Sequence, residues 1–455
     1  MKVLILSTSV NGGAGSSAYR LHRGLLSLGA ESRLLVQQKH IDDETVTVAP
    51  RTLRDRMIRE LDRLAPLGAC DRLPLQLYPK RDRILFSPQW TPDSLQRVIA
   101  QIDPDVVNLG WVCGGFMRIE TMARLAKPMV WMLTDMWPFT GGCHFSDGCN
   151  HYLHACGCCP RLHSQKAADL SHWVWRRKAQ AWKNVNMTVV APSNWMARAA
   201  GASSLFKNRR IEVIPFGLDI SVYKNIDQQA ARRALNLPRD KKIVLFGAWQ
   251  NDRRKGFHLL RQALSRLRQS GWSNKVALTT FGPRPAQEKT RRPFKSYSLG
   301  PLRDEVSLVL AYAAADVTIV PSIQEPFGYV AVESLACGVP VVAFNATGPS
   351  DIVDHRQNGY LAAPFDAEDL ARGIGWVLAD KQRHQRLGRN ARAKAKREYS
   401  LDIFAARYRA LFSDIIEQSN RRPTAGGRRR SGAQLVMTEK EFETDEARDE
   451  KTITH

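Results

Sequence analysis

The sequence lacks any apolar segment long enough to cross a membrane or to serve as a secretory signal. The apolar run from Val3 to Leu6 is short and leads directly into a glycine-rich loop. We therefore expect a cytoplasmic protein whose contacts with a membrane, where it makes them, are peripheral and lie at the inner face.

A recognisable nucleic-acid-binding module is also missing, although the chain is strongly basic. The 455 residues carry 67 Lys and Arg against 44 Asp and Glu, a formal net charge of +23. This charge favours an anionic partner such as nucleic acid, an acidic membrane leaflet or a phosphorylated small molecule. Because the basic residues are scattered over almost every expected helix, most of them are typical of a solvated surface, and we expect no nucleic acid partner.

The apolar residues are spread along the whole chain in two successive series of short runs and amphipathic stretches. At this length two domains are expected. Nearly continuous apolar runs indicate strands that are buried on both faces of a parallel sheet. The runs are VLILST, RLLVQ, DVVNLGW, MVWMLT and MTVVAPS in the first half, and KIVLFG, VALTTFG, VTIVPS and PVVAF in the second. This alternation predicts an α/β protein with two Rossmann-like, doubly wound domains that face one another.

The domain boundaries follow from the same alternation. A strand meets Pro and Gly at IPFGLD, so we expect an N-terminal domain over residues 1–218 and a C-terminal domain over 219–399. From about residue 420 to 455 the chain is made of charge blocks without apolar periodicity, which indicates a disordered tail.

The strongest signal for function is the segment from Pro321 to Val353, PSIQEPFGYVAVESLACGVPVVAFNATGPSDIV. It predicts a strand, a loop that carries Glu325, and a helix that begins near Gly328. Glu333 then lies inside an otherwise apolar helix, where a carboxylate needs hydrogen-bonding or charged partners because its desolvation costs several kcal/mol. The alternative is that Glu325 is a helix cap and that Glu333 has no role in binding.

This segment resembles the nucleotide-sugar signature of glycosyltransferase family 4, whose members are retaining enzymes with the GT-B fold. The resemblance implies that Glu325 holds hydroxyls of the donor sugar and that Glu333 holds the ribose. It places the amides near Phe327 and Gly328 against the sugar and phosphates, where a helix N-terminus favours anions. It also implies that the last helix, residues 400–418, returns to the first domain.

Two loops are expected to bind the donor diphosphate. Gly12 and Gly13 follow the first strand and open the first helix, so their amides can approach a phosphate, although the same glycines are also typical of a tight turn. In the family an Arg and a Lys after the first strand of the second domain hold the diphosphate. Lys255 matches the Lys, whereas Ala248 stands at the Arg position, so Arg254 or its neighbour Arg253 would have to supply that charge.

The acceptor side departs further from the family pattern. Many relatives carry His-Asp where this chain has Thr134-Asp135, so no catalytic His can be assigned there. We expect Asp135 to contact the acceptor. His144 either approaches it from the following loop or, as we prefer, is a satisfied loop residue.

Five of the eight cysteines crowd into one loop, which resembles that of a subgroup acting in bacterial capsule and exopolysaccharide (colanic-acid type) synthesis. In a reducing compartment this crowding favours a metal site over disulfides. Cys143, Cys149, Cys156 and Cys159 offer four thiols, the last two at Cys-x-x-Cys spacing. Cys158 is spare, and His144, His151 or His154 could replace one of the four. Two interpretations stay open: a structural zinc site, or reduced thiols that pack the loop.

Two basic amphipathic segments, residues 51–64 and 172–184, suggest contact with anionic lipid. We prefer the alternative, in which each helix packs its apolar stripe on the domain.

Together these features predict a retaining, metal-independent glycosyltransferase (a hexosyltransferase). It would move a sugar from a nucleoside-diphosphate sugar to a glycan or lipid-linked acceptor in cell-surface polysaccharide synthesis. The catalytic residues would be Glu325, Lys255 and Asp135, with no catalytic cofactor. The alternatives are an epimerase or phosphorylase on the same fold, or a non-catalytic nucleotide-sugar-binding protein.

Overall fold

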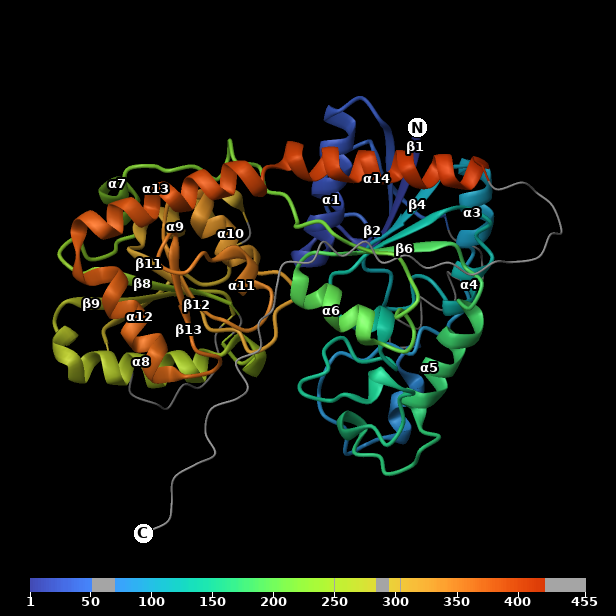
Figure 1. Ribbon diagram of the computed structural model, residues 1–455, viewed down its shortest axis with the longest axis horizontal. Helices are drawn as coiled ribbons and strands as arrows, with labels where there is room; N and C mark the ends of the chain where they lie inside the picture. The colour runs from blue at the N-terminus through green and yellow to red at the C-terminus, as the bar shows by residue number, and fades with distance from the viewer. Residues whose placement is uncertain (51–69, 249, 284–293, 303, 422–455) are drawn as a thin grey trace, which may run out of the picture. The chain divides into compact units, whose positions relative to one another are not determined.

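The computed structural model describes residues 1–50, 70–248, 250–283, 294–302 and 304–421 (Figure 1). The amphipathic segment expected at 51–64 and the tail from residue 422 onward lie outside these ranges. Residues 1–421 form one compact unit.

The first half of the described chain builds a seven-stranded parallel sheet with the strand order β3-β2-β1-β4-β5-β6-β7. Its strands are β1 (Lys2–Ser9), β2 (Glu31–Gln38), β3 (Val46–Val48), β4 (Val106–Leu109), β5 (Met129–Met132), β6 (Met187–Ala191) and β7 (Ile211–Val213). Every residue of β4, β5 and β6 is buried, as expected for central strands covered on both faces.

The second half builds a six-stranded parallel sheet with the order β10-β9-β8-β11-β12-β13. Its strands are β8 (Lys242–Gly247), β9 (Val276–Phe281), β10 (Ser296–Ser298), β11 (Val317–Val320), β12 (Val341–Phe344) and β13 (Gly359–Ala362). In both sheets the order reverses beside the first strand, and ligands of doubly wound proteins bind at the carboxyl ends of the strands at such a switch point.

Helices connect the strands and cover both sheets (Figure 1). Those described are α1 (Gly12–Ser27), α3 (Leu95–Ile102), α4 (Ile119–Ala123), α5 (Leu170–Ala181), α6 (Asn194–Ala202), α7 (Gln228–Ala234), α8 (Phe257–Leu267), α9 (Glu305–Ala314), α10 (Tyr329–Ala336), α11 (Pro349–Ile352), α12 (Ala367–Ala379), α13 (Lys381–Glu398) and α14 (Leu401–Arg421). All nine strands expected from the apolar runs are present, and β7 is the strand expected to end at IPFGLD. The short strands β3, β10 and β13 were not expected.

Helix α14 leaves the second half and packs along α1 of the first (Figure 1). The contact is close: a Cβ added at Gly24 of α1 would lie 2.6 Å from the Cβ of Ala405. The chain crosses between the halves at Leu218, which forms a parallel bridge with Ser400 just before α14 begins. The helix runs to Arg421 and so includes residues 420 and 421, which were expected to belong to the tail.

Helix α5 overlaps the amphipathic segment expected at 172–184, and two of its basic side chains, Arg177 and Lys178, lie against the domain. Arg177 pairs with Glu120 at 2.7 Å and donates to the backbone oxygens of Pro88 and Gln89. Lys178 is fully buried and donates to the backbone oxygens of Trp137 and Thr140. These contacts favour packing of α5 on its domain. Among the described residues, no helix combines the length and apolarity needed to span a bilayer.

His22 is a buried titratable group in the core of the first half. It lies on α1 with Nδ1 2.8 Å from Ser32 Oγ and Nε2 2.8 Å from Thr45 Oγ1. Burial lowers the pKa of His22 from 6.5 to about 4. The unfolded chain therefore takes up this proton at a higher pH than the folded chain, and the folded state loses stability as the pH falls from about 6.5 to 4.

We predict that this single group contributes about 3 kcal/mol of acid destabilisation between those two pH values, at about 1.4 kcal/mol per pKa unit. Urea unfolding of wild type and of His22→Gln at a series of pH values measures it. The variant should lose less stability on acidification than wild type does. Parallel pH profiles for the two proteins would contradict the buried neutral state of His22.

Candidate functional site

The glycine-rich loop lies at the carboxyl end of β1, beside the switch point of the first sheet. Gly12 has a φ of +72°, which favours glycine, and opens α1. A Cβ at Gly15 would lie 2.6 Å from the backbone oxygen of Ser9, so the helix can start this close to the strand only without a side chain there. Gly13 follows with its backbone on the wall of a cavity of about 180 Å³.

Lys255 reaches the same cavity from the loop after β8. Asp252 accepts a hydrogen bond from the Arg254 amide at 3.1 Å and so caps the short 3-10 helix Arg253–Lys255. Gly256 then turns the chain with a φ of +70°, and a Cβ there would lie 1.8 Å from the backbone oxygen of Pro321. This close approach brings Lys255 beside the segment that follows β11.

Glu325 lies on that segment and accepts a hydrogen bond from Nζ of Lys255. The strand order places β8 next to β11, so the loops that carry these two residues flank the switch point of the second sheet. Their side chains keep 29% and 15% of their surface exposed, which leaves both accessible to a ligand. Among the described residues that line the cavity, Lys255 alone carries a positive charge, and Ala248 contributes no charge.

Phe327 and Gly328 complete the wall at the start of α10. Gly328 has a φ of +120°, and the Gly348 amide donates to the backbone oxygen of Glu325 at 2.9 Å, which fixes the loop. The first amides of a helix have no partner within it and favour an anion. The structure therefore brings together Gly13, Lys255, Glu325, Phe327 and Gly328 around one cavity, with Thr134 of the first half also in its lining.

Glu333 lies outside this lining. It is 8% exposed on α10, accepts a hydrogen bond from the Tyr312 hydroxyl at 2.8 Å, and lies 3.8 Å from the Arg20 guanidinium of α1. Burial raises the pKa of Glu333, and the nearby charge of Arg20 opposes that rise. Glu333 therefore has the partners that a carboxylate in an apolar helix requires. One is Tyr312 of the same half, and the other is Arg20 of the other half.

Arg254 also points away from the cavity. Its guanidinium pairs with Asp252 and lies 3.6 Å from the ring centre of Phe145, in the cysteine-rich loop of the first half. Its place in the structure is a contact between the two halves.

Asp135 belongs to a buried hydrogen-bond network after β5. Its Oδ2 lies 2.6 Å from His144 Nδ1 and accepts from Trp111 Nε1 at 2.8 Å, and its Oδ1 accepts from the Trp137 amide. On the far side of the imidazole, Nε2 lies 2.9 Å from Ser87 Oγ. His144 is 1% exposed, so the network fixes the loop after β5 next to Thr134.

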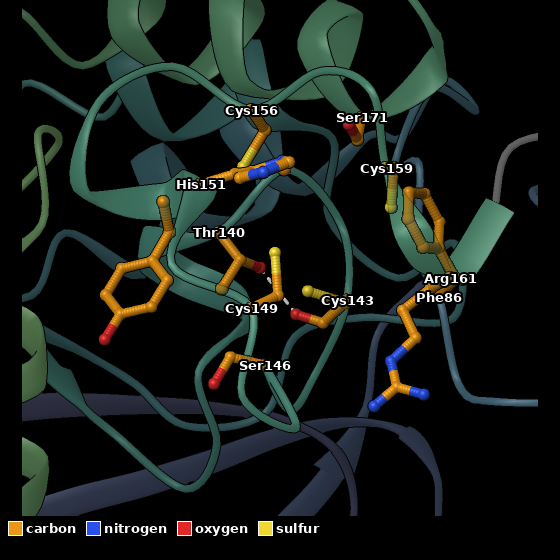
Figure 2. Close-up of a pocket in the computed structure, with 12 residues that line it drawn as sticks. Phe86, Thr140, Cys143, Ser146, Cys149, His151, Cys156, Cys159, Arg161 and Ser171 are labelled. Atoms are coloured by element: carbon orange, nitrogen blue, oxygen red, sulfur yellow. Dashed lines mark hydrogen bonds between the residues drawn. The ribbon is translucent and has the colours of Figure 1, made fainter. Parts of the chain in front are cut away.

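Four cysteines surround a second, smaller cavity in the loop between β5 and α5. Figure 2 shows Cys143, Cys149, Cys156 and Cys159 lining this space of about 20 Å³. Cys158 is exposed and its thiol lies against the backbone oxygen of Gln165. As the described side chains stand, no three of His, Cys, Asp and Glu converge closely enough to form a finished metal site.

Several contacts between the halves could not be predicted from the sequence. Gln324, next to Glu325, accepts from the Asp147 amide at 3.0 Å and donates to Ser146 Oγ at 3.0 Å, both in the cysteine-rich loop. The Tyr329 hydroxyl lies 2.9 Å from Ser17 Oγ of α1, and Arg20 stacks on the Tyr329 ring at 4.8 Å. These residues depend on tertiary partners that no local pattern reveals.

We predict that Arg20→Met lowers the free energy of unfolding by about 3 kcal/mol, because it leaves the Glu333 carboxylate buried without its cation. The double variant Arg20→Met/Glu333→Gln should recover part of this loss. Arg23→Met on the same helix, at a half-exposed arginine, serves as the control and should change stability little. Chemical denaturation of the four proteins decides the matter: equal losses for Arg20 and Arg23 would contradict the pairing.

Comparison with known proteins agrees with this architecture. Residues 11–222 match the model described as Glycosyltransferase Family 4, and residues 227–394 match the model described as Glycosyl transferases group 1. The chain is 34% identical over 231 residues to the D-inositol 3-phosphate glycosyltransferase of Xylanimonas cellulosilytica, covering 47% of this chain and 53% of the relative. It is 29% identical over 212 residues to the lipopolysaccharide 1,2-N-acetylglucosaminetransferase of Salmonella typhimurium, covering 44% and 55%. The chain thus spans about half the length of the curated relatives it matches.

Solved structures share the fold over almost the whole chain. Sucrose-phosphate synthase from Thermosynechococcus elongatus superposes with a TM-score of 0.64 at 19% identity, covering 92% of this chain and 100% of that one. HepE of Anabaena in complex with UDP and glucose gives 0.62 at 20% identity, covering 91% and 99%. The expected fold class is confirmed: the chain has the GT-B fold, with a first Rossmann-like domain that matches the glycosyltransferase family 4 model and a second that matches the glycosyl transferases group 1 model.

Proposed function

We propose that this protein transfers a sugar from a nucleoside-diphosphate sugar to an acceptor hydroxyl. The observation that carries the proposal is the pairing of Lys255 with Glu325 in a cavity whose wall includes the start of α10 and the glycine-rich loop. A cation and helix-terminal amides suit a diphosphate, and a carboxylate suits sugar hydroxyls, so one cavity offers the contacts for both parts of such a donor. The inositol phosphate and lipopolysaccharide transferases among the relatives support this class of reaction.

In this proposal the donor lies across the switch point of the second sheet. Lys255 neutralises charge that develops on the departing diphosphate, and the amides of Gly12 and Gly13 and of the Phe327–Gly328 turn bind its oxygens. Glu325 orients the sugar ring. HepE shares the fold and binds UDP and glucose, which makes uridine donors the first choice for testing.

We assign the ribose to Glu333. Its Oε2 accepts from Tyr312, whereas its Oε1 is 3.8 Å from Arg20, beyond hydrogen-bond distance. This second oxygen therefore retains acceptor capacity for a ribose hydroxyl.

We further propose that transfer retains the anomeric configuration without a divalent ion. The acceptor hydroxyl would attack from the face that the diphosphate leaves, and a phosphate oxygen would take its proton. Because Lys255 lines the cavity and Arg254 does not, the charge of Lys255 and the backbone dipoles carry this stabilisation. Asp135 would act on the acceptor side through the loop after β5.

The acceptor would be a glycan or a lipid-linked molecule in cell-surface polysaccharide synthesis. The lipopolysaccharide transferase among the relatives supports this choice.

One alternative is favoured by two residues in the cavity wall. Ala248 and Thr134 stand where the family resemblance implies an Arg and a His, so the site could bind a nucleotide sugar without transferring it. Incubation of purified protein with a panel of uridine, guanosine and adenosine diphosphate sugars, with and without polysaccharide or lipid-linked acceptors, separates the two functions. Donor binding with neither transfer nor donor hydrolysis would favour the binding protein.

We predict that Glu325→Gln reduces transfer at least tenfold and leaves nucleoside diphosphate affinity nearly intact, because it removes a contact to the sugar alone. Glu333→Gln should instead weaken the nucleoside diphosphate itself, since a charge-assisted hydrogen bond is worth about 1.5–3 kcal/mol. Isothermal titration with the diphosphate and a transfer assay test both variants. If both bind and transfer like wild type, the donor site lies elsewhere.

We also predict that transfer survives brief exposure to EDTA and does not rise when magnesium is added, because side-chain and backbone groups neutralise the leaving diphosphate. Turnover before and after chelation measures this. A loss of turnover that magnesium restores would show that a divalent ion is required.

A further inference from the structure

The cysteine-rich loop separates its five thiols into two groups. Cys143, Cys149, Cys156 and Cys159 line one cavity of about 20 Å³ (Figure 2), whereas Cys158 faces outward and contacts the Gln165 backbone. A cavity of this size is close to the minimum of about 10–15 Å³ needed for one water molecule, so it suits a single ion rather than an organic ligand. The fold thus gathers the four thiols that the spacing suggested, and His151 also lies in the lining.

We propose that these four cysteines bind one structural zinc ion. Thiolates are the preferred ligands of closed zinc sites, in which four sulfur atoms surround the metal at about 2.3 Å. The thiols now line the cavity without converging fully, so binding would draw them inward around the ion. A zinc ion offsets the repulsion between thiolates that would otherwise have to be buried together.

Close backbone packing fixes the position of Cys156, one of the four cysteines. A Cβ added at Gly141 would lie 2.6 Å from the Cys156 Cβ and 2.9 Å from its sulfur, so this approach requires glycine.

A buried amine lies beside the cluster. Lys178 is fully buried and donates hydrogen bonds to the backbone oxygens of Trp137 and of Thr140, which itself lines the cavity. A zinc ion with four thiolates carries a formal charge of −2, and a protonated amine at this place would balance part of that charge in a medium of low dielectric constant.

The site would fix a loop that contributes several of the contacts between the halves. Phe145, Ser146 and Asp147 lie between Cys143 and Cys149, and they contact Arg254 and Gln324 of the second half. The zinc proposal does not require the proposed transfer activity, because it concerns only metal content and loop stability.

The test compares protein produced without an affinity tag for wild type, Cys158→Ser and Cys156→Ser/Cys159→Ser. Elemental analysis should give about one zinc ion per chain for wild type and for Cys158→Ser, the matched control, and a loss of at least tenfold for the double variant. Zinc K-edge absorption on wild type should show four sulfur neighbours at about 2.3 Å. The melting temperature of the double variant should fall by several degrees as the loop loses its cross-link.

The zinc K-edge spectrum of wild type and the zinc content of Cys158→Ser test the proposal even where the double variant does not fold. Wild-type protein from zinc-supplemented cultures with less than a tenth of a zinc ion per chain would overturn the proposal. So would zinc bound through nitrogen or oxygen alone, or an equal loss of zinc from Cys158→Ser. A mass shift that shows disulfides among the four cysteines would also overturn it.

Discussion

A carboxylate buried in an apolar helix sets the main constraint on this structure. Glu333 cannot be desolvated alone, and its two partners come from opposite halves of the chain: the Tyr312 hydroxyl and the Arg20 guanidinium. Arg20 also stacks on Tyr329, which contacts Ser17, so α1 and α10 meet through polar and aromatic groups. The start of α10 and the glycine-rich loop are thereby held on the wall of one cavity.

The sequence predicted the elements whose burial leaves a continuous apolar pattern. Central strands such as β5 and β11 are buried along their whole length and were expected at the observed places. The edge strands β3 and β10 have three residues each. Val46 alone is buried in β3 and no residue is buried in β10, so no apolar run indicated them. A strand leaves a recognisable apolar pattern in the sequence only where most of its residues are buried, and these edge strands have too few buried residues.

The candidate site divides in the same way. Glu325 and Lys255 could be assigned because the sequence around each of them resembles a donor-binding motif of glycosyltransferase family 4. Arg20 and Gln324 could not be, because their roles come from partners more than a hundred residues away in the sequence. For Arg254 the sequence supplied the charge but not its direction, since Asp252 and Phe145 hold its guanidinium away from the cavity.

The two places where the chain passes between its halves lie next to each other. Leu218 donates its amide to the Tyr399 backbone oxygen and accepts from the Leu401 amide, so the outgoing and returning segments are hydrogen-bonded at the crossing. Two connecting segments at separate places would resist rotation of one half relative to the other. Two connecting segments at one place instead act together as a single hinge. Opening of the two halves would therefore be a rotation about the Leu218–Ser400 bridge, and the contacts farthest from that hinge would separate by the largest distance.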